Sequence, residues 1–246
     1  MTASAGTRTL RYGGDPSQVA ELTLPGGTPR GVVVVIHGGF WRARYDLSLG
    51  RPLAESLVAE GWAACNLEYR RVGPAGSGGG GGTPETFDDV AAGIDRLAGV
   101  DGLDTSVLIT LGHSAGGHLA AWAAGRGNAD VRVSGVVAQA GVLDLVRADE
   151  QNLGDGAVRS LLGHAPGPGD AAYDPVRQLP LDVPVRCVHG TADAVVPIDQ
   201  SQLYVDAATA AGTDATLTEV EGDHDVVIDP GSAAWARTLA LLDGLA

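Results

Sequence analysis

The pentapeptide Gly112-His113-Ser114-Ala115-Gly116 follows the pattern G-x-S-x-G. It comes after an apolar run typical of a buried strand and before an alanine-rich run typical of a helix. On such a sharp strand-to-helix turn the serine hydroxyl stands clear of the backbone, and the two glycines relieve the crowding. The helix N-terminus favours negative charge that develops beside it. We predict that Ser114 is a nucleophile; the alternative is a structural turn serine.

A second motif, HGGFW at residues 37–41, follows an apolar strand-like run at residues 31–36. Paired glycines after this strand let backbone N–H groups approach a substrate carbonyl oxygen. We therefore predict an oxyanion hole formed by the N–H groups of Gly39, Phe40 and Ala115. One such donor contributes roughly 2.7–4 kcal/mol to transition-state stabilisation.

The side chains beside these two motifs are candidates to line a substrate pocket. We name Trp41 and His113 for this role, and the Phe40 ring is a further candidate. Core packing is the alternative for both the Phe40 and the Trp41 rings.

A serine nucleophile needs a base, and the chain has six histidines. His224 lies on a loop after the last predicted strand and follows every candidate acid, as the chain order Ser, Asp, His requires. We predict His224 as the base. His118, one helical turn after Ser114, is expected to be structural, and His189 ends a predicted strand.

The acid that orients the base should lie on the loop after the preceding strand, where the sequence offers Asp193. Asp144, after the strand before that, is the main alternative. Asp199 fits the N-cap of a helix better. Asp223 and Asp225 flank the predicted base and are badly placed to receive its far nitrogen. We predict that Asp193 completes a Ser-His-Asp triad.

Apolar strand-like runs alternate with helical patterns, which predicts an α/β fold with a mostly parallel sheet. The expected strands are residues 31–36, 62–69, 107–111, 135–140, 185–188 and 215–220, with an edge strand at 21–24. The expected helices are residues 51–60, 115–124, 200–211 and 233–242, and one that begins with Thr83 as N-cap and Pro84 at the first helical position.

The alternation continues across the glycine run at residues 76–82, so we interpret that run as a surface connection and residues 1–246 as a single domain. Residues 144–181 are rich in glycine and proline and irregular in pattern. We expect them to form a small cap or lid inserted over the sheet.

The composition excludes several classes of protein. All 16 basic residues are arginine, so chemistry that needs a lysine amine is impossible. Thirty acidic residues give a net charge of -14, which disfavours nucleic-acid binding. Cys65 and Cys187 lie in apolar runs and are expected in the core, and no Cys/His spacing suggests a metal site. Without an apolar leader or a membrane-length apolar run, we expect a cytoplasmic protein that binds no membrane.

Four segments together resemble the α/β-hydrolase superfamily across nearly the whole chain. They are HGGFW at 37–41, GHSAGGHLA at 112–120, HGTADAVVP at 189–197 and GDHD at 222–225. The first two look like the branch that contains kynurenine formamidases (arylformamidases) and small carboxylesterases. The resemblance implies an eight-stranded, mostly parallel sheet flanked by helices, a triad of Ser114, Asp193 and His224, and no cofactor.

These observations predict a serine hydrolase that cleaves a small-molecule ester or activated amide through an acyl-enzyme. Three alternatives are an aryl formamide hydrolase of the N-formylkynurenine type, a small peptidase like prolyl oligopeptidase, and a non-catalytic binding protein of the same fold. Self-association into a homodimer is left open.

Overall fold

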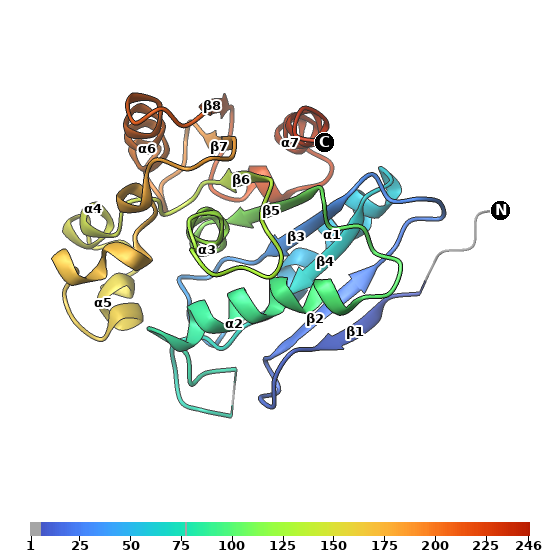
Figure 1. Ribbon diagram of the computed structural model, residues 1–246. Coiled ribbons are helices and arrows are strands. Elements are labelled where there is room, and N and C mark those ends of the chain that lie inside the picture. The colour runs from blue at the N-terminus through green and yellow to red at the C-terminus, as the bar shows by residue number, and fades with distance from the viewer. Residues whose placement is uncertain (1–5, 77) are drawn as a thin grey trace.

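A single eight-stranded sheet forms the centre of the protein (Figure 1). The computed structural model describes residues 6–76 and 78–246. In chain order the strands are β1 (Arg8–Arg11), β2 (Val19–Thr23), β3 (Val32–Ile36), β4 (Ala63–Leu67), β5 (Leu108–His113), β6 (Gly135–Gln139), β7 (Val185–Gly190) and β8 (Ala215–Val220). Their order in space is β1-β2-β4-β3-β5-β6-β7-β8. The pairs from β4 to β8 are parallel, and the two pairs that β2 makes, with β1 and with β4, are antiparallel.

The central strands are buried on both faces, which explains their continuous apolar sequences. In β3, Val32, Val34 and Ile36 belong to one hydrophobic core, while Val33 and Val35 belong to a second. This alternation is the two-residue period of a strand whose two faces are both covered.

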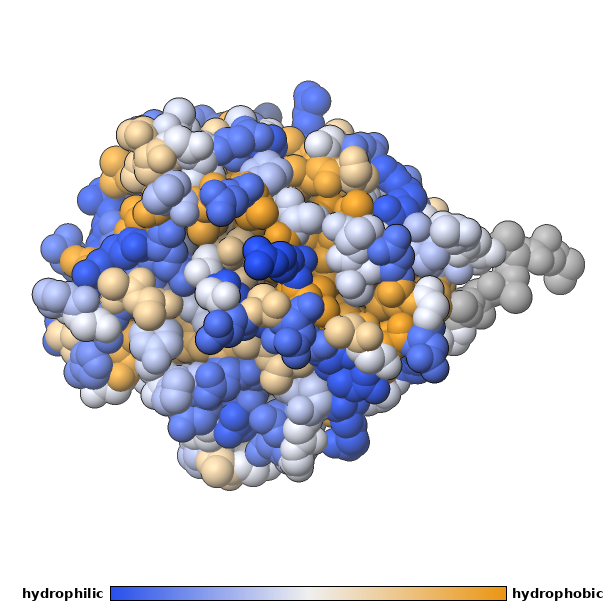
Figure 2. All heavy atoms as spheres, in the orientation of Figure 1, coloured by the Kyte–Doolittle hydropathy of each residue, from blue (hydrophilic) through white to orange (hydrophobic). Residues whose placement is uncertain are grey.

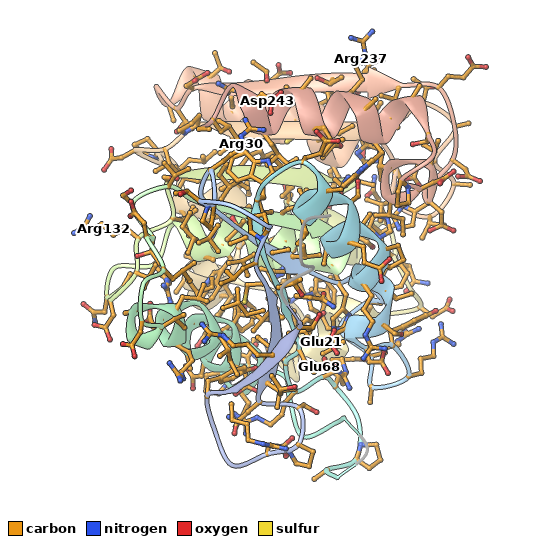
Figure 3. All side chains as sticks on the ribbon, turned by 90° about the vertical axis from the view of Figure 1, so that its right-hand side faces the viewer. Glu21, Arg30, Glu68, Arg132, Arg237 and Asp243 are labelled. Carbon is orange, nitrogen blue, oxygen red and sulfur yellow. The ribbon has the colours of Figure 1, made fainter. Side chains whose placement is uncertain are left out.

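Helices cover both faces of the sheet. They are α1 (Arg51–Ala59), α2 (Glu85–Asp95), α3 (Ala115–Ala124), α4 (Leu145–Glu150), α5 (Ala157–Leu162), α6 (Asp199–Ala210) and α7 (Ala233–Asp243). Leu57 of α1 and Trp235 of α7 pack into the core on one face, whereas α2, α3 and α6 pack on the other. Arg30, just before β3, pairs with Asp243 at the end of α7 at 2.8 Å (Figure 3). The arrangement confirms the α/β-hydrolase fold.

The N-terminal edge of the sheet differs from the sequence prediction. Residues 21–24 were expected to form an edge strand, but β2 lies one position inside the edge, between β1 and β4. The outer strand is β1, in which only Leu10 is buried. A strand with one buried residue lacks the apolar pattern that marks the others, so the sequence did not reveal it.

The start of α2 also differs from the prediction. The helix begins at Glu85 with Pro84 in the N-cap position, so Thr83 is not the cap. The Thr83 N–H instead donates to the carbonyl oxygen of Leu161 at 2.9 Å. Thr83 therefore joins the start of α2 to the end of α5.

Residues 144–181, between β6 and β7, carry α4, α5 and two short 3-10 helices, and α4 and α5 project beyond the sheet in Figure 1. One turn of this insertion contacts the segment at residues 37–41. Arg42 donates a hydrogen bond to the carbonyl oxygen of Gly154. A Cβ atom on Gly154 would lie 2.6 Å from the ring of Phe40. The insertion is thus packed directly against the predicted oxyanion segment.

The face shown in Figure 2 mixes polar and apolar residues in small groups. Across residues 6–76 and 78–246, every helix is too short or too polar to cross a lipid bilayer. Cys65 and Cys187 are buried free thiols, as predicted.

Candidate active site

Ser114 occupies the strained turn that the G-x-S-x-G motif predicts. It lies between β5 and α3 with φ 56° and ψ -118°, and its N–H donates to the carbonyl oxygen of Gln139 at 2.8 Å. A Cβ atom on Gly112 would lie 2.0 Å from the carbonyl oxygen of Gly116, and one on Gly116 would lie 2.0 Å from that of Ile36. Both glycines are therefore needed for the close approach of backbone at this turn.

The segment after β3 lies against Ser114. A Cβ atom on Gly38 would come within 3.1 Å of the Ser114 Cβ. Gly39 and Phe40 both have positive φ, 110° and 52°. A phenylalanine in this conformation is strained and persists only where surrounding contacts hold it. Ala115 is the first residue of α3, where the N–H has no partner within the helix. The segment with the predicted donors Gly39 and Phe40 thus begins against the Ser114 side chain, and the Ala115 N–H lies at the start of α3.

His224 and Asp193 form a direct hydrogen bond. The Nδ1 atom of His224 lies 2.6 Å from Oδ2 of Asp193. The other carboxylate oxygen accepts from the N–H groups of Val195 at 2.8 Å and Val196 at 2.9 Å. Because Nδ1 is held by the acid, Nε2 is the nitrogen left to accept a proton from a hydroxyl group.

The Asp193 side chain is fully buried, yet its carboxylate accepts three hydrogen bonds and lies 3.2 Å from Nε2 of His189. Burial raises the pKa of this carboxyl group, but hydrogen bonds from His189, His224 and the Val196 N–H outweigh burial and hold the pKa well below its ordinary value. The carboxylate is therefore ionised near neutral pH and can stabilise a protonated His224.

His189 is a member of this site that the sequence did not reveal. Its Nε2 lies 3.2 Å from Oδ2 of Asp193 and 2.9 Å from the carbonyl oxygen of Val196. The sequence indicates only that His189 ends a strand. The spacing of four residues between His189 and Asp193 was the available signal for their contact. A loop this short keeps Asp193 close to the end of the strand that carries His189.

His113, a candidate for the substrate pocket, contacts the loop that carries His224. The residue is buried, and its Nε2 lies 3.0 Å from the carbonyl oxygen of His224. The centres of the His113 and His224 rings lie 4.4 Å apart. Burial and the neighbouring His224 lower the pKa of His113 to about 3, so the ring is neutral and donates one hydrogen bond. It joins the His224 loop to the turn that carries Ser114.

Trp41, the other pocket candidate, also lies in the core, where it is 1% exposed and meets the edge of His118 at 5.1 Å between ring centres. His118 itself contacts the carbonyl oxygen of Tyr173 at 2.8 Å, consistent with the structural role expected for it. Phe40, by contrast, is only partly buried.

The alternative acids have other roles. Asp144 caps α4 and accepts from the Arg147 N–H at 2.9 Å. Asp199 is the first residue of α6 and pairs with Arg147, so the N-cap prediction for it is wrong; the cap position is Ile198. Asp223 accepts from the N–H groups of Asp225 and Val226.

A larger groove and a group of metal ligands are two other features that could mark a functional site. A groove of about 1050 Å³ runs between α1 and the end of β2, but no predicted site residue lines it. Within the part of the chain that the structure describes, no group of three or more His, Cys, Asp or Glu side chains is arranged to hold a metal ion.

Comparison with known proteins places the chain in a family. Residues 22–207 match the model of the BD-FAE family, more than half of the chain, and the protein belongs to that family. It is 27% identical to esterase LipC of Mycobacterium tuberculosis over 230 residues, and 28% identical to the isoprenylcysteine alpha-carbonyl methylesterase ICME of Arabidopsis thaliana over 245 residues. These matches cover 82% and 87% of this chain, which spans 55% of the length of either relative.

Solved structures share the fold along almost the whole chain. A truncated carbohydrate esterase from gut microbiota superposes with a TM-score of 0.82 at 21% identity, covering 99% of this chain and 97% of that one. The native thermophilic esterase Est2 of the planctomycete Thermogutta terrifontis superposes with a TM-score of 0.76 at 25% identity, covering 97% and 91%.

Proposed function

We propose that the protein is a serine hydrolase that cleaves a small carboxylic ester or activated amide. The observation that carries the proposal is the 2.6 Å contact between His224 Nδ1 and Asp193 Oδ2. The His224 backbone is joined at 3.0 Å to His113, the residue before Ser114, which has φ 56° on a strand-to-helix turn. The nucleophile, the acid and the base occur in this order along the chain, each after a strand, as this chemistry requires.

The proposed reaction has two halves. His224 Nε2 takes the proton of the Ser114 hydroxyl as Oγ attacks the substrate carbonyl carbon, and the N–H groups of Gly39, Phe40 and Ala115 stabilise the oxyanion. His224 then protonates the leaving alcohol or amine, whose bond to the acyl carbon breaks. In the second half water attacks the acyl-enzyme, His224 takes its proton, and the acid leaves as Ser114 regains a hydrogen.

The relatives support an ester as the substrate. Both curated relatives are named as esterases, and so is the Thermogutta terrifontis structure at 25% identity. The triad roles of Ser114, Asp193 and His224 and the oxyanion roles of Gly39, Phe40 and Ala115 belong to the same proposal.

Replacement of Ser114 by alanine tests the proposal. The wild-type protein should turn over p-nitrophenyl acetate and butyrate, and the Ser114→Ala variant should lose this turnover by at least about a thousandfold with an unchanged melting temperature. Turnover at the wild-type rate by a folded Ser114→Ala protein would rule out the assignment.

The finer choice of substrate needs a panel. Values of kcat/KM for short esters, an aryl formamide of the N-formylkynurenine type and aminoacyl amides would separate an esterase from a formamidase and from a small peptidase. A burst of p-nitrophenol followed by steady turnover would exclude the non-catalytic binding protein. A cytoplasmic location, the absence of nucleic-acid and membrane partners, the absence of a cofactor, and the homodimer remain predictions.

A further inference from the structure

A buried carboxylate outside the triad, Glu68, lies beside the predicted oxyanion segment. Glu68 follows β4 directly, and the parallel register of β3 and β4 pairs Ile36 with Leu67. The next residues of the two strands, His37 and Glu68, therefore leave the sheet side by side. The Glu68 side chain is only 7% exposed.

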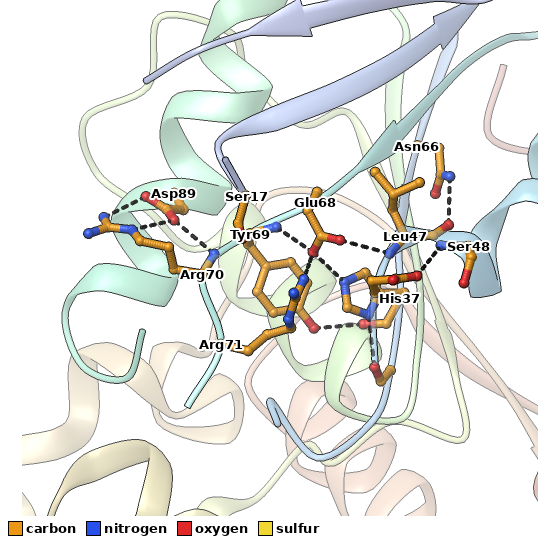
Figure 4. Close-up of polar contacts among 12 residues, drawn as sticks. Ser17, His37, Leu47, Ser48, Asn66, Glu68, Tyr69, Arg70, Arg71 and Asp89 are labelled. Atoms are coloured by element: carbon orange, nitrogen blue, oxygen red, sulfur yellow. Dashed lines mark hydrogen bonds and ion pairs between the residues drawn. The ribbon is translucent and has the colours of Figure 1, made fainter. Parts of the chain in front are cut away.

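The Glu68 carboxylate is surrounded by donors (Figure 4). Its Oε1 lies 3.0 Å from Nε2 of His37 and accepts from the Tyr69 N–H at 2.9 Å. Its Oε2 accepts from the Leu47 N–H at 2.9 Å, and the Arg71 guanidinium pairs with Oε1. A carboxylate with a cationic partner and several N–H donors is ionised and acts only as an acceptor.

Two of these contacts lie at opposite ends of one segment. His37 begins the loop after β3, and Leu47 begins the 3-10 helix that ends it. Gly39 and Phe40, two of the proposed oxyanion donors, lie between them. A single carboxylate thus fixes both ends of the segment that carries these donors.

The His37 ring is held on its other sides as well. Tyr69 stacks on it with 4.5 Å between ring centres and donates its hydroxyl hydrogen to the His37 carbonyl oxygen at 2.9 Å. Burial lowers the pKa of His37 to about 4, so the ring carries one proton near neutral pH. Each ring nitrogen faces an acceptor: Nε2 faces Glu68 Oε1 at 3.0 Å, and Nδ1 faces the Gly38 carbonyl oxygen at 2.9 Å. The charged acceptor forms the stronger bond, which favours the tautomer with the proton on Nε2.

We propose that Glu68 is a positioning residue for the oxyanion hole. Through His37 and the Leu47 N–H it sets the path of residues 37–47, so that the Gly39 and Phe40 N–H groups face the oxygen that becomes negative in the transition state. The inference rests on the proposed hydrolase function. It predicts that loss of the Glu68 charge lowers kcat more than it changes KM, because oxyanion contacts strengthen in the transition state.

Asp89 supplies a matched control. It is 1% exposed and accepts from the Arg70 side chain and from the Arg70 N–H, much as Glu68 does from Arg71 and Tyr69 (Figure 4). Its partners lie outside residues 37–47. We expect Glu68→Gln to lower kcat for p-nitrophenyl acetate by roughly ten- to a hundredfold with KM within a factor of about two. Asp89→Asn should lose similar thermal stability and keep kcat. Equal kcat in both variants would overturn the inference.

A second pair of variants keeps the inference testable if Glu68→Gln does not fold. The amide nitrogen of a glutamine at position 37 can still donate toward Glu68, whereas a leucine cannot. We expect His37→Gln to retain at least about ten times the kcat of His37→Leu. Indistinguishable kcat values would refute a role for the Glu68 contact.

Failure of the inference can be distinguished from failure of the proposed function. If the wild-type protein hydrolyses no ester or amide of the panel, the proposed function is wrong. Amide hydrogen exchange over residues 37–47 then decides the structural role of Glu68. Faster exchange there in Glu68→Gln, but not in Asp89→Asn, would support positioning by Glu68, and unchanged exchange would reject it.

Discussion

The carbonyl oxygen of His224 lies 3.0 Å from Nε2 of His113, the residue immediately before Ser114, although 111 positions separate the two histidines. The bond joins the loop that carries the proposed base to the turn that carries the proposed nucleophile. It does so through the backbone of His224, which leaves the imidazole free to bind Asp193.

Replacement of His113 by phenylalanine should preserve the buried ring and remove this bond. We expect kcat for p-nitrophenyl butyrate to fall by roughly tenfold, since small displacements of a base are costly to proton transfer. The melting temperature should fall by a few degrees, reflecting a net hydrogen bond of about 1 kcal/mol. The exposed His164, changed to phenylalanine, is the control. An unchanged kcat in His113→Phe would show that the bond does not position His224.

The glycines of the turn should tolerate no side chain. In Gly116→Ala the new methyl group would meet the Ile36 carbonyl oxygen at 2.0 Å, and we expect a loss of about 1–3 kcal/mol or more in the free energy of unfolding. Gly127 has open space around its would-be Cβ and an ordinary φ, so Gly127→Ala should be nearly neutral. Urea unfolding of the two variants checks this. Equal stabilities would contradict the crowding argument.

Buried neutral histidines should make the protein less stable as the pH falls. Burial lowers the pKa of His37 and His118 to about 4 and, with His224, that of His113 to about 3, from an ordinary 6.5. Between pH 6.5 and 4 the unfolded chain therefore binds more protons than the folded one, and stability decreases toward acid. Asp174 acts in the opposite sense, because burial raises its pKa to about 6.

Three histidines act against one carboxyl group in this window. We therefore expect the free energy of unfolding to fall by on the order of 2–3 kcal/mol for each pH unit toward acid. Urea unfolding at several pH values measures it. His118→Phe should reduce the slope by about one proton, whereas His164→Gln should not. A free energy of unfolding that does not change with pH would show that these rings are protonated in the folded state.

Acidic residues near the base should favour cationic over anionic substrates. Glu221, Asp223 and Asp225 are exposed and flank His224. For two esters matched in length, with a terminal trimethylammonium or carboxylate group, we expect kcat/KM to differ by roughly three- to tenfold at low salt. The difference should nearly vanish at 1 M salt, where the screening length is about 3 Å. Equal rates at low salt would refute this preference.

Much of the fold and the site could be predicted because the relevant signals are local. The strand-turn-helix at Ser114 and the strand-loop positions of Asp193 and His224 depend on short runs whose chemistry is visible in the sequence. β1 escaped prediction because one buried leucine makes no pattern. Glu68 escaped for a different reason: its contact with His37 depends on the register between β3 and β4, which no residue spacing specifies.

The contacts of Gly154 bear on how the insertion and the oxyanion segment can move. Arg42, which follows the HGGFW motif, holds the Gly154 carbonyl oxygen, and the Phe40 ring fills the space that a side chain on Gly154 would need. The insertion and the oxyanion segment are therefore held together at Gly154. Any opening of the insertion that carries Gly154 away must break the Arg42 hydrogen bond and uncover Phe40, whose own N–H is a proposed oxyanion donor. Substrate entry by that route and the geometry of the oxyanion hole are therefore coupled through three adjoining residues.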